Sequence, residues 1–475
     1  MRNKRLAGIS ILLWIASAML LLMLAFNCYY HYFAGIAQSF SAGELLLEQI
    51  NSRNTLCFAL FYVLVLLFGG RMQHCANRCF AWQLICCAAG TLAFVLWMVL
   101  CNEAVALFCG GSVSLTFGDI APLKNTVLGM TVVWLRFFSV ALFITCIDRL
   151  MGNPKGALMA TLLGVIDFNF YYYIGLEMPT HLSAIEHSLV TYDSISEIDY
   201  FFPSAKENLL YWAVVLVLLT VGLYLACRFG RESTARPQKR NARADWPIAV
   251  AVIAVFSLLN TNTLCRMLEL NRDNASSLDI FYITVMSYNI MMNAYPALLA
   301  AVAGRVNDAV QPEDPFPRRL GSTVKKACVG GAALTAGVCI PLLVIMALFP
   351  AAERFSMDIF GTISFAAGKP AVYLALFLIN TFAVGFCYAI LARAIAYAGG
   401  RGWLALFLPN LISSAATFYP FRSAGILDWF PIDSYDIAAK SRPLVTHIFS
   451  IAIIAVAGLV LQALTAKKKR ANGEE

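Results

Sequence analysis

Apolar residues along this chain gather into runs of about 20, separated by shorter polar segments. A helix needs roughly 20 apolar residues to cross about 30 Å of hydrocarbon at 1.5 Å per residue. The pattern therefore predicts an all-α polytopic membrane protein of about 12 transmembrane helices. The predicted spans cover residues 6–33, 55–70, 79–101, 126–148, 156–175, 209–227, 247–265, 280–303, 327–349, 371–397, 402–419 and 444–466.

Lysine and arginine residues fall mainly in alternate loops, and this bias predicts the orientation. With the N-terminus in the cytoplasm, the inward segments hold 24 of the 35 basic residues and the outward loops hold 10. One more, Arg136, lies inside a predicted span. We therefore expect both termini in the cytoplasm of a multi-pass protein.

The two halves of the chain resemble each other. A shift of 244 positions places Phe138 on Phe382 and Arg149 on Arg393 without a gap. Because six spans return the chain to the side from which it started, such halves form parallel repeats. The prediction is a first six-span unit at 1–228, a basic cytoplasmic linker at 229–246 and a second six-span unit at 247–475.

The composition supports the membrane class, since 60% of the residues are apolar and 13% are charged. Soluble domains carry about 25% charged residues. The net charge of +8 arises from basic residues at span ends, so we expect no nucleic-acid partner. Most of the 14 cysteines lie in apolar runs, where they act as small apolar side chains. The sequence leaves open whether Cys101 and Cys109, which flank an outward loop, form a disulfide.

Enzyme motifs are missing from the sequence. It contains no phosphate-binding loop, no zinc-protease helix motif and no nucleophile elbow. We therefore expect a protein that is not an enzyme, without a metal or cofactor of its own. His181, Glu186, His187 and Asp193 offer metal ligands in one outer loop, but a wet loop that happens to hold two histidines is the favoured interpretation.

Charged residues inside a membrane are costly and usually have a purpose. Arg136 and Asp167 fall at similar depths, roughly 12–15 Å from the outer surface, on antiparallel neighbouring spans. They are a candidate intramembrane pair that either locks two helices together or lines a polar path. The shift of 244 replaces them with Asn380 and Leu411. Candidate path-lining residues are Asn289, Asn293, Asn380 and Asn410, although asparagine more often joins helices.

Two inward segments are candidate coupling loops for an ATPase, marked by Arg71 and Arg78 in the first half and by Arg318 and Arg319 in the second. Positive-inside anchoring explains the same residues. The second segment is long enough for a short amphipathic helix, which we place at residues 318–327.

This layout resembles two fused permease subunits of the type-2 ABC exporter class. Arg71–Arg78 and Arg305–Lys326 match the position of the family's coupling segment, and Leu182–Lys206 and Phe421–Lys440 match its outer segment before the last span. The chain departs from the family at its start, where five residues precede the first span instead of an interfacial helix.

The resemblance implies an exporter permease in the plasma membrane of a bacterium, surrounded by membrane lipid. ATP would be bound and hydrolysed by a separate cytoplasmic ATP-binding subunit, present as two copies or a dimer. No cofactor is expected on this chain itself.

Other classes stay open. A major-facilitator-like secondary transporter also has two parallel six-span repeats, but Gly69–Arg78 lacks the Asp-Arg pair expected there, and the outer loops are long for that fold. A membrane glycosyltransferase places paired acids in its first outer loop, whereas Glu44 and Glu48 lie four apart on what reads as an exposed helix. An accessory membrane protein without a transport role is the third alternative.

Overall fold

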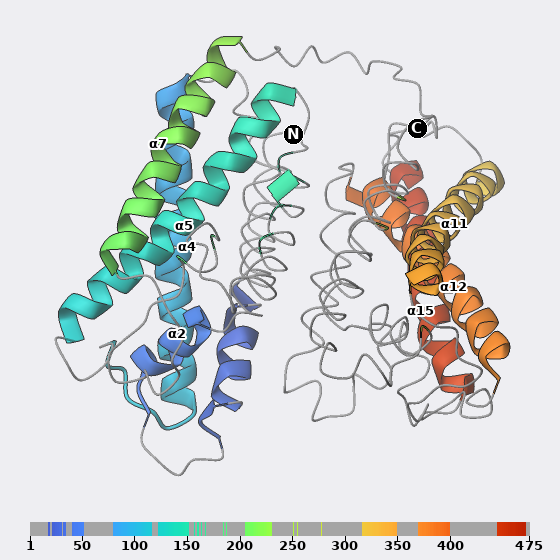
Figure 1. Ribbon diagram of the computed structural model, residues 1–475, viewed down its shortest axis with the longest axis horizontal. Coiled ribbons are helices and arrows are strands. Elements are labelled where there is room, and N and C mark those ends of the chain that lie inside the picture. Colours follow the sequence, from blue (N-terminus) through green and yellow to red (C-terminus); the bar gives the residue numbers. More distant parts are fainter. Residues whose placement is uncertain are drawn as a thin grey trace. The chain divides into compact units, whose positions relative to one another are not determined.

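The structure is a computed structural model of the whole chain, and nearly all the residues that it describes are helical (Figure 1). The described residues are 18–19, 21–30, 32–34, 40–51, 79–115, 122–151, 156, 159–160, 163, 167, 184, 187, 205–229, 250, 254, 277, 316–348, 369–399 and 444–471. No named strand lies among them, and the one isolated bridge joins Ser41 to Ser112.

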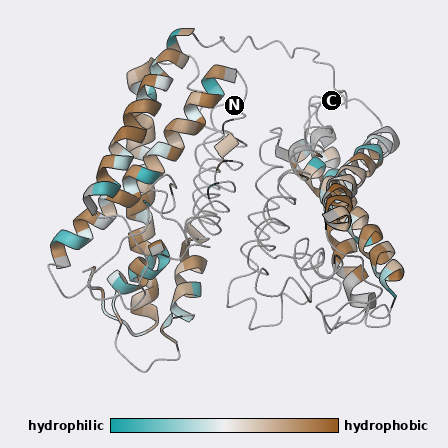
Figure 2. Ribbon diagram, in the orientation of Figure 1, coloured by the Kyte–Doolittle hydropathy of each residue, from teal (hydrophilic) through white to brown (hydrophobic). Residues whose placement is uncertain are grey.

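Seven helices have defined bounds. They are α2 (Ala42–Asn51), α4 (Phe80–Phe108), α5 (Pro122–Met151), α7 (Ala205–Phe229), α11 (Phe316–Leu348), α12 (Pro370–Gly399) and α15 (Leu444–Ala471). Five of them, α4, α5, α7, α11 and α12, are long and apolar enough to cross a membrane. Figure 2 shows the apolar character along their length.

These five helices lie where the apolar runs predicted spans, and they fit a multi-pass membrane protein. The last predicted span lies in α15, whose apolar helical stretch Ile451–Ala466 is shorter. Spans predicted at 55–70, 280–303 and 402–419 lie outside the described residues, and those at 156–175 and 247–265 almost entirely so. The total of 12 helices therefore stays a prediction.

The C-terminal end of α4 extends seven residues beyond its predicted apolar run and closes with a reversal of the chain. Gly110 adopts a φ of 81°, and the N–H of Gly111 donates to the carbonyl of Ala106 at 2.7 Å. This is the hydrogen-bond pattern of a Schellman cap. Because Cys101 lies within the same helix and Cys109 caps it, their eight-residue separation corresponds to about 12 Å. The alternative of a disulfide between Cys101 and Cys109 is therefore wrong, and both residues are free thiols.

A short helix, α2, packs against the C-terminal end of α4. Its N-terminus has a capping box: the Ser41 hydroxyl accepts the N–H of Glu44 at 3.1 Å, and the Glu44 carboxylate accepts the N–H of Ser41 at 2.7 Å. The helix predicted here is confirmed, but most of it is buried, including Leu45 and Leu46. Of its two acids, Glu44 is exposed and Glu48 is half-buried.

Contacts divide the chain into two compact units, residues 1–236 with 418–420 and residues 237–417 with 421–475. Within the first unit, α5 contacts both α4 and α7, and within the second unit α12 contacts both α11 and α15 (Figure 1). Among the described helices we call α5 and α12 the central helices of their units, because each makes the most extensive contacts with two others. The predicted domain limits and the linker at 229–246 stay a prediction, because nearly all of that linker lies outside the described residues.

Candidate functional site

The central helix of the first unit carries a buried cation. Arg136 is 7% exposed, and its Nη1 atom has no hydrogen-bond partner among the described residues. Its chain neighbour Phe137 is buried and packs edge-on against Phe94 of α4, with ring centroids 5.3 Å apart. A buried guanidinium in such surroundings is costly unless an anion or a polar group meets it. Arg136 is therefore the strongest candidate for a functional group in this unit.

The proposed partner of Arg136 is engaged in another contact. Asp167 is half-buried, and its Oδ1 accepts the backbone N–H of Ala184 at 3.0 Å. This bond fixes one oxygen of the carboxylate and leaves open what the other oxygen contacts. The Arg136–Asp167 pair stays a prediction.

The equivalent position of the second unit is also buried and polar. Asn380 on α12 is 5% exposed, and the neighbouring Thr381 donates its hydroxyl to the carbonyl of Phe377 at 2.8 Å. Both central helices thus carry a buried polar residue at the same repeat position, charged in one and neutral in the other. The other candidate path-lining residues, Asn289, Asn293 and Asn410, lie outside the described residues.

The second candidate coupling segment runs directly into a span. Arg318 and Arg319 lie in the first turn of α11, and the predicted amphipathic helix at 318–327 is the start of this 33-residue helix instead of a separate element. The first segment, with Arg71 and Arg78, lies outside the described residues. Both segments stay candidates for coupling.

A histidine of the outer loop is part of the packed structure, which the sequence did not reveal. His187 is 3% exposed, its Nδ1 lies 3.0 Å from the Asn208 side-chain oxygen, and its ring stacks on Tyr211 at 4.0 Å. The Trp212 indole N–H also donates to the His187 carbonyl at 2.9 Å. The wet-loop interpretation is therefore wrong for His187, which anchors the chain before α7 to that helix. His181, Glu186 and Asp193 lie outside the described residues.

Three helix contacts define the packing of the first unit. Between α4 and α5, Cys87 Sγ lies 3.3 Å from the Thr145 hydroxyl. Between α5 and α7, a Cβ placed on Gly222 would lie 3.4 Å from Cys146 Sγ. Between α4 and α7, the Cys227 thiol donates to the Gln83 side-chain oxygen at 3.4 Å.

The second unit has contacts between the corresponding pairs of helices. Between α11 and α12, a Cβ on Gly385 would lie 3.0 Å from the Cα of Gly331, and between α12 and α15 a Cβ on Gly458 would lie 2.9 Å from Ile390. The third contact, Thr323 with Gln462 at 3.3 Å, joins α11 to α15.

The shift of 244 places Cys87 on Gly331 and Cys146 on Ile390, so one residue of each of these two contacts lies at a position related by the predicted repeat. Their partners, Thr145 with Gly385 and Gly222 with Gly458, do not correspond under that shift, and the repeat stays a prediction. Thr91 and Thr335 do correspond, and each donates its hydroxyl to the carbonyl four residues earlier.

Comparisons of the chain with protein-family models, with curated proteins and with solved structures found no match.

Proposed function

We propose that this chain is the transmembrane permease subunit of an ABC-type exporter. It moves a substrate across the plasma membrane, and a separate cytoplasmic ATPase chain binds and hydrolyses the ATP. Two six-span units fused in one chain supply the whole membrane part, and the ATPase is present as two copies or a dimer.

The observation that carries this proposal is the same packing order of the described helices in the two units. In each unit the helix of the fourth predicted span packs between those of the third and the sixth. In each unit the last helix places a glycine, Gly222 or Gly458, against the same repeat position of the central helix, Cys146 or Ile390. Paired bundles of one design are what a fused exporter permease requires. A secondary transporter of the major-facilitator kind shares parallel repeats, so the energy source decides between the two.

Coupling to an ATPase needs a stiff element that reaches the cytoplasmic side. At 33 residues, α11 is about 50 Å long, well over the roughly 30 Å of the hydrocarbon core. Its inner end bears Arg318 and Arg319, and two hydrogen bonds join it to the other helices of the unit, Arg393 to Ser322 and Thr323 to Gln462. A push on this end would pass directly into α12 and α15.

The test is affinity purification of the tagged full chain in mild detergent. We expect a nucleotide-binding subunit to co-purify and to hydrolyse ATP, with recovery lowered by R71A/R78A and by R318A/R319A. Lys369 precedes α12 at its opposite end, so K369A is the matched control and should leave recovery unchanged. Recovery of the chain alone, together with proton-coupled uptake into vesicles, would establish the secondary transporter instead.

A further inference from the structure

All lysine and arginine residues of α11, α12 and α15 belong to one end of this three-helix group. They are Arg318, Arg319, Lys325, Lys326, Arg393, Lys467, Lys468, Lys469 and Arg470, and we call them the basic rim. The rim lies at the start of α11 and at the ends of α12 and α15. These three helices contain no aspartate or glutamate.

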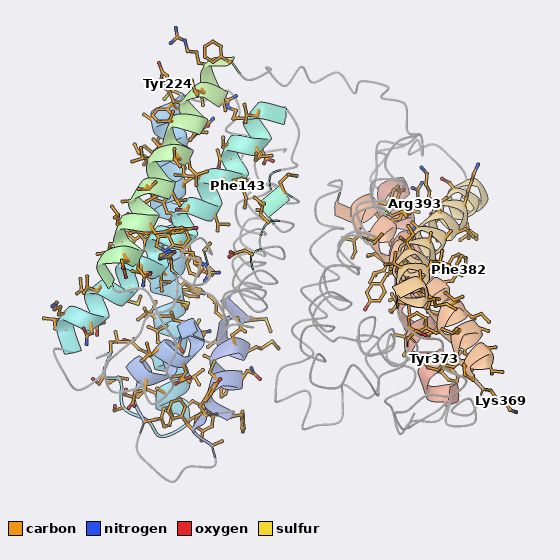
Figure 3. All side chains as sticks on the ribbon, in the orientation of Figure 1. Phe143, Tyr224, Lys369, Tyr373, Phe382 and Arg393 are labelled. Carbon is orange, nitrogen blue, oxygen red and sulfur yellow. The ribbon has the colours of Figure 1, made fainter. Side chains whose placement is uncertain are left out.

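Two hydrogen bonds hold the three helix ends of the rim together. The Arg393 Nη2 donates to the Ser322 hydroxyl at 2.8 Å, which joins the end of α12 to the start of α11. Thr323 and Gln462, 3.3 Å apart and both buried, join the start of α11 to the end of α15. Figure 3 shows Arg393 near one end of α12 and Lys369 at the other.

Exposed apolar side chains lie directly beside the rim. Leu464 is 61% exposed on α15, three residues before Lys467, and Val324 is 39% exposed on α11, next to Lys325. On α11 the exposed apolar side chain of Val324 is followed directly by the exposed Lys325, which matches the change from acyl chains to headgroups in a bilayer. The rim therefore lies at headgroup depth.

We propose that the basic rim binds the phosphate headgroup of an anionic lipid, with the acyl chains against the exposed apolar side chains of α11 and α15. Under the predicted orientation this lipid belongs to the inner leaflet. Basic residues beside a span attract anionic lipid, and the attraction is strongest where several converge. The rim shares Arg318 and Arg319 with the coupling segment proposed above, but the lipid site is tested at Lys325 and Lys326, which the coupling test leaves unaltered.

The test is native mass spectrometry of the purified full chain with phosphatidylglycerol and phosphatidylcholine added in equal amounts. We expect phosphatidylglycerol to be preferred, and the preference to fall in 0.5 M salt because the attraction is screened. In K325Q/K326Q its affinity should drop by about 25-fold, from about fivefold for each of the two charges lost. K325R/K326R keeps the charge and should keep the lipid.

K369Q removes a lysine from the opposite end of α12 and serves as the control for general charge. Unchanged phosphatidylglycerol affinity in K325Q/K326Q, or an equal loss in K369Q, would overturn the proposal. So would displacement of the lipid signal by millimolar inorganic phosphate, because the site would then bind free anion. Thermal unfolding of each variant shows whether a lost lipid reflects a lost fold, and retention of lipid by K325R/K326R would establish that the charge is what binds.

Discussion

Gly331 lies where α11 crosses α12, and adding one methyl group there tests the packing of the second unit. A Cβ on Gly331 would lie 2.8 Å from the carbonyl oxygen of Phe382 and 3.1 Å from the Phe382 ring. The oxygen belongs to the backbone of α12, so it cannot move aside as the tip of a side chain does. The variant G331A therefore has to push the two helices apart.

The same helix supplies the control for this substitution. A Cβ on Gly321 would meet nothing within 4 Å. In G321A, therefore, only the helix propensity changes, and alanine stabilises a helix interior by about 0.5–1 kcal/mol relative to glycine. In G331A the same gain is outweighed by overpacking, which costs about 1–3 kcal/mol, and the rigid backbone contact favours the upper part of that range. We expect a net loss of about 1–2 kcal/mol.

Thermal unfolding in detergent measures both variants, with a thiol-reactive dye as the probe. Cys387 on α12 is 8% exposed, so its thiol becomes available only when the packing opens. G331A should unfold at a lower temperature than the unaltered chain and G321A at the same or a higher temperature. A shift of both variants in the same direction would refute the reasoning, because the change in propensity is identical and only the contact differs.

Three further predictions concern the first unit. H187A should lower the unfolding temperature, because it removes the ring stack on Tyr211 at 4.0 Å and a buried hydrogen bond. Limited proteolysis should then cleave the chain ahead of α7 earlier than in the unaltered protein. Unchanged cleavage would contradict the anchoring role of His187. Burial raises the pKa of Glu48 above its ordinary value of 4.5, so the free energy of unfolding should fall as pH rises from about 4.5 through the raised pKa. E48Q should remove this dependence of unfolding on pH. A dependence that persists in E48Q would belong to another group. R136D and D167R should each impair folding or transport, and the double swap should restore both if the two side chains pair; a swap that restores nothing would exclude the pair.

The positions of the helices could be predicted from the sequence because the length of an apolar run reflects the thickness of the membrane. The helix ends were less predictable. The polar residues Asn102 and Glu103 end the apolar run of α4. The helix nevertheless continues to Phe108, and Gly110 forms the cap that follows it. Hydropathy responds to the polar residues, whereas the end of a helix depends on its cap.

The packing order of the helices could not be predicted from hydropathy. Leu142 on α5 is fully buried and Leu218 on α7 is 66% exposed, although both lie in apolar helices. Lipid tails are as apolar as leucine, so a leucine is equally well accommodated by lipid and by another helix. Small residues carry the information instead, since Gly331, Gly385 and Gly458 each lie at a helix crossing.

The same argument explains why a repeat of the predicted kind would leave few identities in the sequence. Two helices approach closely either where side chains are absent, as at Gly331 and Gly385, or where small polar side chains bond to each other, as at Cys87 and Thr145. The two solutions share few residue identities. Two units of the predicted repeat can therefore keep the same helix packing order with different residues at the crossings. On this view a residue that differs in chemistry between the units, such as the buried Arg136, is the place to look for what the first unit does and the second does not.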